Sequence, residues 1–448
     1  MSLAKYAVKG DFDSDIDQII YSNPFKRLAN KSQIIIKPTR DHFRSRLIHT
    51  EEVNRIALDI AKGLNLNLSL ITAISMAHDI GHTPFGHAGE RAIQTILERE
   101  LLVRFRVKIS KNKREEIIRK IFHHSLNSVR LLLKGNEFEG ISKGVIEGIL
   151  THSWSPWKKI CLYNIPNSYE GQVVAIADQI ASINHDTEDI IEGEPYTEYN
   201  FTRFKAELIN GFKRSHPDSF KNLNSKISNF IEDKLIESGY GRKRRIKNII
   251  EDLVCESKKI FKNNNINNCF MAYSHPLNLS YDLSNFIRYY EDFIRRLIQQ
   301  KIPWFIGRDC MAAALISTVF NHLWSRVRTT STVSQMKLPL FNEKDLIKTK
   351  IETKEMQYLD HFKAFYKEHY KGLEDNQDFY FLFLEETKES NFKTWDFYIL
   401  NSLISQKLSE HDKEKFSRLI AVIDFIAGLT DRYCLEIFNQ VYKEFLLV

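Results

Sequence analysis

The chain has 448 residues, enough for one large domain or two to three smaller ones. With 43% apolar residues, 27% charged residues and few Gly or Pro, its composition excludes a disordered or fibrous protein. No apolar run approaches the ~20 residues of a membrane span, and no signal-peptide core precedes the first helix, so we expect no membrane partner.

The net charge of +7 is mild and suits an anionic ligand or weak contact with nucleic acid. Five scattered cysteines without CxxC spacing argue against a disulfide framework or a cysteine zinc site, which favours a reducing cytoplasm.

Apolar residues recur with a period near 3.6 along most of the chain, and this pattern predicts a mostly α-helical protein. The acidic stretch to about Ile20 predicts a poorly packed lead-in, and Tyr21–Leu28 either lines a polar pocket or forms a capped helix. Thr50, followed by two glutamates, predicts the N-cap of a helix that runs to Leu64. Further helices are predicted at about 68–79, 87–103, 113–134, 142–152, 170–192, 200–213, 220–237, 245–261, 282–300, 308–326, 356–369, 396–409 and 414–446, with loops at 262–268 and 328–345.

The densest group of chemically versatile side chains lies in residues 78–90, HDIGHTPFGHAGE, at the end of an apolar helical run. Adjacent His78 and Asp79 can bind one metal ion only if the backbone turns sharply after them, and Gly81 with Pro84 supplies that break. The first part of the segment therefore predicts a pair of metal ligands.

A second pair follows in the same segment. After Gly86, the first turn of a new helix puts His87 and Glu90 at i and i+3, on one face. The carboxylate can then orient the imidazole. A ligand pair followed by an imidazole–carboxylate pair predicts a metal-dependent hydrolase.

Two distant residues complete the predicted ligand set. His49 lies at the mouth of a predicted helix, where it could face a site. Asp178 interrupts the apolar face of the 170–192 helix, and burying a free carboxylate there is so costly that it must be paired, hydrogen-bonded or metal-bound. Together with His78 and Asp79 they form a nitrogen and oxygen donor set that suits Mn²⁺, Fe²⁺, Co²⁺, Ni²⁺ or Zn²⁺, with Mg²⁺ possible beside phosphate.

These residues carry a resemblance to the HD-domain phosphohydrolases, and within them to the deoxyguanosine triphosphate triphosphohydrolase (dNTPase) family. The superfamily signature H…HD…D is matched by His49, His78-Asp79 and Asp178, and HDIGHTPFGHAGE is close to the family's HDxGHPPFGHxGE. FKRLANKSQI resembles FRRLxxKTQV, and RSRLIHTEEV resembles RTRLTHSxEV. EGQVVAIADQIASINHDTEDII resembles ExQVVxxADxIAYxxHDxxDA, and DFIAGLTDRY resembles DYIAGMTDRYA. The similarity covers roughly residues 20–192 and 417–440.

The resemblance implies an all-α fold, with an HD-domain helical core in residues 1–195 that holds the metal. Residues 196–448 would form a helical region that packs on the core and closes the pocket, so that the two regions make one compact unit. It also implies hydrolysis of dGTP or several dNTPs to deoxynucleoside and inorganic triphosphate by a homo-oligomer that depends on Mn²⁺ or Mg²⁺.

By position, the resemblance also implies residue roles. The family cleaves at the α-phosphorus, so an acid has to protonate the leaving 5′-oxygen. His87 is the expected donor, held by Glu90, and His82 contacts phosphate or orients the site. The implied metal ligands are His49, His78, Asp79 and Asp178.

The implied substrate contacts are more varied. The guanidinium of Arg46 suits phosphate oxygens, and Gln33 and Asp186 match positions that read the deoxyribose. His124 and Tyr433 are also expected at the substrate. For His124 a purely helical role stays open, and for the segment around Tyr433 packing or pocket closure is the alternative.

Other interpretations remain open. The family's Tyr four residues after the last metal aspartate is replaced by Ser182 here. Gly241–Arg245 is a basic cluster, which forms either a solvated face or a contact for an effector nucleotide or single-stranded nucleic acid. Rival functions are therefore another HD-superfamily nucleotide phosphohydrolase or phosphodiesterase, and a nucleotide-sensing or DNA-binding module with weakened catalysis. His152 is expected to be structural, and His185 belongs to either the pocket or the packing.

Overall fold

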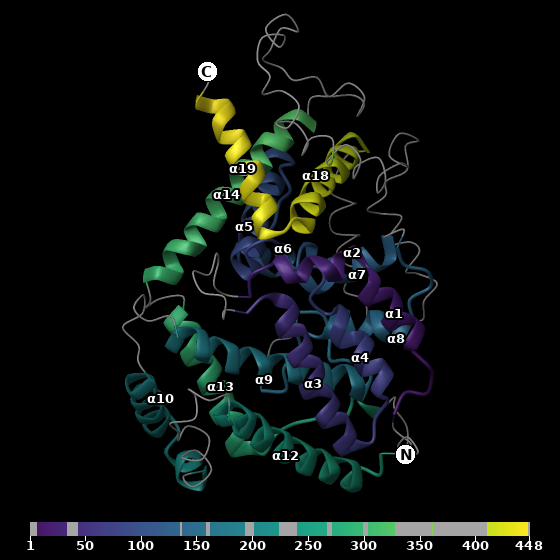
Figure 1. The fold of residues 1–448 in the computed structure, drawn as a ribbon, viewed down its shortest axis with the longest axis vertical. Coiled ribbons are helices and arrows are strands. Elements are labelled where there is room, and N and C mark those ends of the chain that lie inside the picture. The colour runs from purple at the N-terminus through teal and green to yellow at the C-terminus, as the bar shows by residue number, and fades with distance from the viewer. Residues whose placement is uncertain are drawn as a thin grey trace, which may run out of the picture. The chain divides into compact units, whose positions relative to one another are not determined.

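The computed structural model describes residues 7–33, 44–134, 137–157, 162–192, 201–223, 240–266, 271–298, 303–327, 361 and 410–446. Within these ranges the elements are helices, and the one β pairing is an isolated bridge between Ser32 and Ser45. The all-α prediction is confirmed (Figure 1). None of the helices in the described part is both long and apolar enough to cross a membrane. The loop predicted at 328–345 and the helix predicted at 396–409 lie outside the described residues, as do all of 356–369 except residue 361 and the part of 220–237 that follows residue 223.

The chain divides into two compact units, each built from two stretches of sequence. Unit 1 comprises Met1–Ile80 and Ser128–Asp309, and unit 2 comprises Gly81–Asn127 and Cys310–Val448. The domain boundary that the sequence predicts at residue 195 stays a prediction.

The core of unit 1 is a group of four helices: α3 (Arg46–Leu64), α4 (Leu68–Ala77), α8 (Lys143–Thr151) and α9 (Tyr169–Glu192). α9 packs along α3, and α4 packs against α3, α8 and α9. The apolar face of α9 is fully buried, as at Val173, Ile176 and Ile180, because α3 and α4 cover it. At Gly148 of α8 a Cβ atom would lie 2.4 Å from the side chain of Ile74, so glycine permits this close approach.

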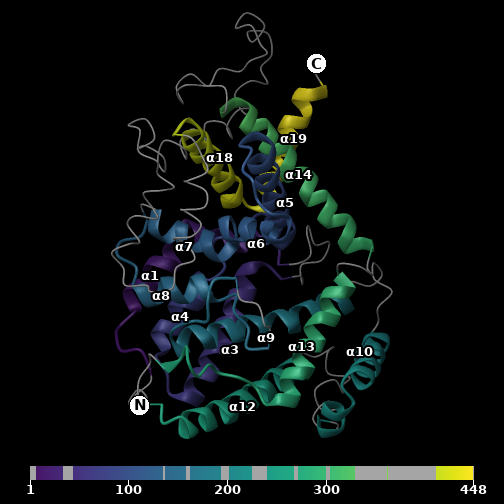
Figure 2. The same ribbon diagram turned by 180° about the vertical axis from the view of Figure 1, so that it is seen from behind.

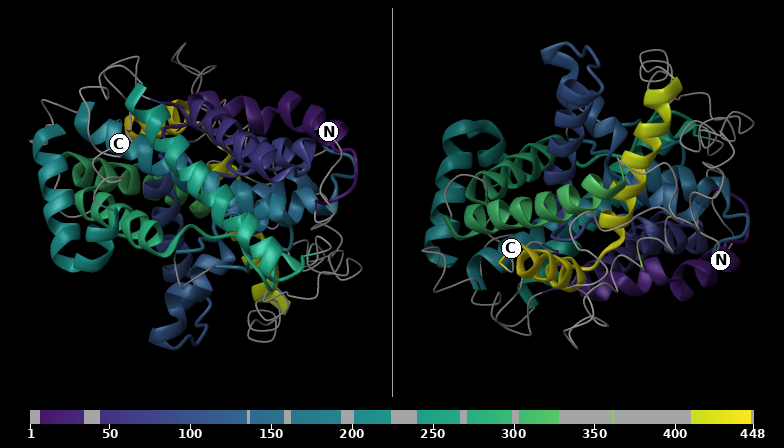
Figure 3. Two further views of the ribbon diagram at one scale, coloured as in Figure 1. Left: turned by 90° about the horizontal axis from the view of Figure 1, so that it is seen from below. Right: turned by 90° about the horizontal axis from the view of Figure 1, so that it is seen from above.

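The remaining helices of unit 1 surround this core. α12 (Tyr240–Asn263) packs against α3, as the view from below shows (Figure 3). The other elements are α1 (Asp13–Tyr21), α2 (Asn23–Arg27), η1 (Leu28–Asn30), most of α7 (His124–Lys134), α10 (Phe201–Ser215), α12 (Tyr240–Asn263) and α13 (Tyr281–Arg296).

The N-terminal prediction was wrong. The acidic stretch does not form a loose lead-in but folds into α1, which packs on α4. Phe12 and Ile19 are buried, and the carboxylate of Asp15 accepts a hydrogen bond from the Ser142 backbone N–H at 3.2 Å. Apolar residues on one side of a short helix are enough to anchor it when a neighbouring surface is available.

Unit 2 contains α5 (Gly86–Arg99), which continues into the π-helical turn η2 (Glu100–Arg104), followed by α6 (Lys111–Ile121). From the C-terminal part come α14 (Pro303–Val327), α18 (Glu410–Gly428) and α19 (Asp431–Leu446). The buried Glu100 carboxylate accepts hydrogen bonds from Arg99 and from Trp324 of α14. These contacts hold α5 and α14 side by side (Figure 2).

Three predicted helix boundaries were also wrong. α3 begins at Arg46 with Ser45 as its N-cap, so Thr50 lies inside the helix. The segment 113–134 is interrupted by an extended Phe122, with φ −138° and ψ 112°, and α7 begins at His124. The segment 414–446 is two helices, α18 and α19, separated at Leu429 and Thr430.

Candidate functional site

The structure brings the four predicted metal ligands together in unit 1. His49 lies in the first turn of α3, His78 and Asp79 follow the end of α4, and Asp178 lies in the middle of α9. The Asp178 Oδ1 atom is 3.0 Å from His49 Nε2 and 3.9 Å from His78 Nε2. Asp79 oxygens lie 3.6 Å from His78 Nε2 and 3.9 Å from His49 Nε2. One ligand atom each of His49, His78 and Asp79 lies within 4.8 Å of the other two, and Asp178 adjoins both histidines.

The end of α4 explains how two adjacent residues point the same way. The His78 N–H still donates to Ile74 O, but Ile80 N–H donates to Ala77 O, so the chain tightens into a turn. The start of α7 holds this turn, because the Ser128 hydroxyl donates to the His78 carbonyl at 2.8 Å. Within unit 2, the Asn127 side chain donates to the Gly81 carbonyl at 2.7 Å.

The hydrogen bonds of His78 fix its tautomer. Its Nδ1 lies 2.6 Å from the Ser75 carbonyl, and because a carbonyl only accepts, Nδ1 carries the proton. Nε2 then presents a lone pair, and it is buried with no hydrogen-bond partner among the described residues. A buried lone pair without a donor is costly, and a metal ion would satisfy it.

A relay of side chains fixes the tautomer of His49 in the same way. Burial, with a contribution from His49, lowers the pKa of His185 to about 4, so His185 is neutral with a single N–H. His185 Nε2 lies 2.5 Å from the Glu52 carboxylate and must be its donor. His185 Nδ1 therefore accepts, and His49 Nδ1–H donates to it at 3.0 Å. The free lone pair of His49 is on Nε2, the atom that faces Asp178.

Two acceptors that face each other at 3.0 Å require a proton or a cation between them. Burial raises the pKa of Asp178, but when a proton on His49 Nε2 takes that place, its hydrogen bond and charge outweigh the effect of burial and lower the pKa well below the usual range of a carboxyl. The carboxylate is thus anionic. A divalent cation would satisfy both imidazole lone pairs and both carboxylates at once, so the donor set fits a metal ion.

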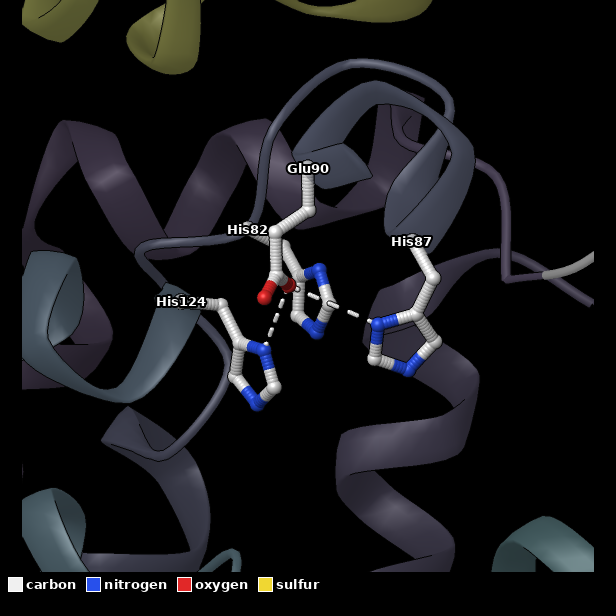
Figure 4. A group of neighbouring side chains, drawn as sticks. All are labelled: His82, His87, Glu90 and His124. Carbon is white, nitrogen blue, oxygen red and sulfur yellow. Dashed lines mark hydrogen bonds and ion pairs between the residues drawn. The ribbon is translucent and has the colours of Figure 1, made fainter. Parts of the chain in front are cut away.

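Unit 2 holds a second cluster, made of His82, His87, Glu90 and His124 (Figure 4). Glu90 Oε2 accepts from His124 Nδ1–H at 2.8 Å and lies 3.5 Å from His87 Nδ1. The rings of His82 and His124 stack with their centroids 3.9 Å apart. Burial raises the pKa of Glu90, but His123 and His124 outweigh it and hold the pKa well below its usual range. The result is a buried anion surrounded by imidazoles, of which the His87 side chain is 62% exposed.

A strained turn positions this cluster. Phe85 and Gly86 both adopt left-handed backbone conformations, with φ of 63° and 58°. The Phe85 N–H donates to the Asp431 carboxylate at 2.8 Å, which links the turn to the first residue of α19. At Gly89 a Cβ atom would lie 2.0 Å from the Pro84 carbonyl oxygen, so only glycine fits the next turn of α5. The HDIGHTPFGHAGE segment and the C-terminal DFIAGLTDRY segment therefore meet at the turn that precedes His87.

Comparison with known proteins agrees with this geometry. Residues 46–183 match the family model of the HD domain. The chain is 40% identical over 192 residues to the deoxyguanosinetriphosphate triphosphohydrolase-like protein of Caldanaerobacter subterraneus subsp. tengcongensis, covering 42% of this chain and 48% of the relative. It is 30% identical over 297 residues to the protein of that name from Rickettsia felis, covering 62% of this chain and 68% of the relative. The chain belongs to the deoxyguanosinetriphosphate triphosphohydrolase family of HD-domain proteins.

The family match is uneven along the chain. The Clostridium tetani member is 37% identical over 218 residues, which are 47% of this chain and 54% of that relative. The chain thus spans about half the length of several curated family members that it matches. Residues 46–183 contain His49, His78, Asp79 and Asp178 and the whole histidine cluster of unit 2.

The predicted substrate residues of this family member lie in different surroundings. Arg46 is 1% exposed and forms an ion pair with Asp79 at 2.5 Å, so its guanidinium touches a candidate metal ligand. The side-chain carbonyl of Gln33 is buried and makes no hydrogen bond to any described residue. Burial and the charges of Asp189 and Glu291 raise the pKa of Asp186 well above its usual value. Contacts of these residues with a substrate stay predictions.

Tyr433, at the start of α19, also stays a predicted substrate contact. Its hydroxyl hydrogen-bonds to His361, and burial raises its pKa to about 12. The Tyr433 N–H donates to the Thr430 hydroxyl at 3.2 Å, which fixes the start of the helix.

Ser182, which replaces the family's Tyr, donates its hydroxyl to Asp178 Oδ1 at 3.4 Å. In the basic cluster Gly241–Arg245, Arg245 is not on a solvated face but is buried, and its Nε–H donates to Asn184 of α9 at 3.0 Å. The side chains of residues 241–244 lie outside the described set.

Sequence reasoning missed several residues that act on the site. Glu52 lies three positions after His49 on α3, and this helical spacing was a usable signal. His152, expected to be structural, packs edge-on against the His78 ring with centroids 5.1 Å apart, and burial lowers its pKa. Asp431 lies in the DFIAGLTDRY motif, but its contact with Phe85 could not be predicted, because the partner is distant in sequence, and Ser128 acts on a backbone carbonyl.

Proposed function

We propose that this protein is a metal-dependent dNTP triphosphohydrolase, which hydrolyses dGTP or several dNTPs to deoxynucleoside and inorganic triphosphate. One observation supports it above others: two buried imidazole lone pairs and two carboxylates converge in a chain of this family. Mn²⁺ or Mg²⁺ is the expected cofactor, with Fe²⁺, Co²⁺, Ni²⁺ or Zn²⁺ as alternatives.

His49, His78, Asp79 and Asp178 would hold the cation, which when bound lowers the pKa of water and neutralises phosphate charge. The other contribution of this chain is to orient the side chains that would bind the cation. Ser75 and His185 keep the Nε2 atoms of the two histidines free of protons, and Arg46 holds Asp79. His49, His78 and Asp79 are buried and held by these contacts, so they need little rearrangement before the reaction.

The remaining requirement is a proton for the leaving group. Water attacks the α-phosphorus, the bond between phosphorus and the 5′-oxygen breaks, and the alkoxide takes a proton. We assign this proton to His87, whose exposed ring can reach a substrate and whose Nδ1 faces Glu90. Glu90 orients His87, and His82 contacts phosphate or supports the site through its stack on His124.

The proposal includes the finer expectations from the sequence. Gln33, Arg46, His124, Asp186 and Tyr433 contact the substrate, the protein acts as a homo-oligomer in the cytoplasm, and an effector nucleotide or single-stranded nucleic acid is a further partner. Ser182 in place of Tyr leaves more room beside Asp178, which favours a changed sugar or base preference.

The test is a substrate panel. The protein with Mn²⁺ or Mg²⁺ is incubated with each dNTP, and the products are separated by ion-exchange chromatography. We expect deoxynucleoside and inorganic triphosphate as products. This activity should be lost in His78→Ala and kept in the control His216→Ala, which removes the histidine directly after α10. Pyrophosphate with a monophosphate would indicate another HD-superfamily nucleotide hydrolase, and tight dNTP binding without turnover would indicate a sensing module. Either result refutes the proposal.

A further inference from the structure

We propose that the unit 2 cluster of His82, His87, Glu90 and His124 is a second cation site, which binds a transition-metal dication such as Zn²⁺ and inhibits the enzyme when filled. The binding part of this inference stands on unit 2 alone. The inhibitory part rests on the proposed function, because it uses the role assigned to His87.

The donor atoms are already close enough for one ion. One ligand atom from each of the four residues lies within 4.8 Å of all the others. In a tetrahedral zinc site with Zn–N distances of about 2.0–2.1 Å, the ligand atoms are ~3.4 Å apart. Glu90 Oε2 is 2.8 Å from His124 Nδ1 and 3.5 Å from His87 Nδ1, so these donors are close to ligand spacing, and the stacked rings of His82 and His124 have to turn until a nitrogen of each points at the ion.

The chemistry of the donors differs from that of the HD centre. Three imidazoles and one carboxylate form a nitrogen-rich set, whereas His49, His78, Asp79 and Asp178 offer two nitrogens and two carboxylates. Imidazole ligands favour Zn²⁺ over Mn²⁺ and Mg²⁺, which prefer oxygen. The unit 2 cluster should therefore discriminate more strongly against Mn²⁺ and Mg²⁺ than the set of His49, His78, Asp79 and Asp178 does.

Neighbouring groups hold the carboxylate in a ligand-like orientation. The Gln94 side chain donates to Glu90 Oε1 at 3.2 Å and also to the Phe122 carbonyl at 3.0 Å. His123 Nε2 lies 3.6 Å from the same Oε1 atom. These contacts engage Oε1 and direct Oε2 towards His124 and His87, as outer-shell hydrogen bonds do around bound metals (Figure 4).

Charge and access also suit a cation. Glu90 is 5% exposed, and a buried carboxylate is stabilised by a positive ion that it contacts directly. His82 and His124 are equally buried, but the His87 side chain is 62% exposed and leaves a path for an ion to enter. With Nδ1 of His87 bound to a metal, the ring cannot become an imidazolium, and its remaining N–H is too weak an acid to protonate the 5′-oxygen, so occupancy should stop turnover.

Binding is measured first, without activity. In the full-length His78→Ala/Asp79→Ala variant, Zn²⁺ is titrated in competition with a chromophoric chelator. We expect about one Zn²⁺ per chain from this site. Adding His124→Ala or Glu90→Gln should weaken binding at least tenfold, whereas adding His216→Ala should not. Circular dichroism spectra verify that the variants fold, and Co²⁺ provides a second readout, because its visible bands should disappear with His124→Ala.

Two results would overturn the site: no Zn²⁺ binding in the His78→Ala/Asp79→Ala variant, or binding that survives the loss of both His124 and Glu90. The inhibitory role is tested by adding Zn²⁺ to the Mn²⁺-loaded parent protein and measuring dNTP hydrolysis. Loss of turnover at the Zn²⁺ concentration that fills the site supports it. Zn²⁺ binding without inhibition would leave the site intact but refute the role assigned to His87, which separates the two proposals.

Discussion

The relay from Glu52 through His185 to His49 makes a quantitative prediction about metal affinity. The substitution His185→Ala removes the acceptor that keeps the proton of His49 on Nδ1, 3.0 Å away. Without it, the buried His49 ring gains freedom to rotate or to carry its proton on Nε2, the atom that faces Asp178. Loss of such an outer-shell partner weakens metal binding about 10- to 100-fold. That range corresponds to ~1.4–2.7 kcal/mol of binding free energy.

Two further variants separate orientation from packing. His185→Asn restores an acceptor oxygen near the position of Nδ1, so we expect a loss of less than tenfold. Glu52→Gln leaves an oxygen that still accepts from His185 Nε2–H, and its effect should also be small. His216→Ala is the control for loss of an imidazole elsewhere in unit 1.

The assay is Mn²⁺ binding, followed by isothermal titration and by the electron paramagnetic resonance signal of free Mn²⁺. Thermal midpoints of the metal-free proteins check that each variant folds. The reasoning fails if His185→Ala binds Mn²⁺ as tightly as the parent protein, or if His185→Asn binds as weakly as His185→Ala.

Two more predictions concern the turn that positions His87, and a third concerns the stability of the protein. Gly89→Ala should abolish dNTP hydrolysis and lower the thermal midpoint, because its Cβ would lie 2.0 Å from the Pro84 carbonyl oxygen. The control Gly428→Ala should do neither, because there is open space around its Cβ. Asp431→Ala should reduce kcat by loosening the Phe85 turn, and Asp431→Asn, which keeps an acceptor, should recover most of it; equal rates in both would contradict this role. Burial raises the pKa of Glu147 from 4.5 to about 7, so the native state binds more protons between these values and loses stability as pH rises through them. Glu147→Gln should therefore gain up to ~3 kcal/mol over the parent in urea unfolding at pH 8 but not at pH 4, and a gain independent of pH would refute the assignment.

Metal removal follows from the same geometry. Chelation of the bound ion leaves the His78 and His49 lone pairs and two carboxylates facing one another, so the thermal midpoint should fall and rise again with added Mn²⁺. In His78→Ala, the midpoint should respond less to Mn²⁺, and an unchanged response would argue against binding at this centre.

The sequence by itself determined what depends on local pattern. The 3.6-residue period predicted the helices, and the 170–192 segment nearly coincides with α9 (Tyr169–Glu192). The break after His78-Asp79 and the i, i+3 spacing of His87 and Glu90 were readable because a turn and a helical face each involve only a few neighbouring residues.

Only the tertiary structure decided which distant groups meet. The Phe85 N–H and the Asp431 carboxylate are separated by 346 positions, and His49 and His185 by 136, so no local period could pair them. The packing of α1 and the interruption at Phe122 were mispredicted because each depends on neighbouring helices rather than on the segment's own sequence. Tautomers and buried charges are set by the three-dimensional surroundings of each atom, and for that reason the proton positions on His49 and His78 became clear only once the helices were packed.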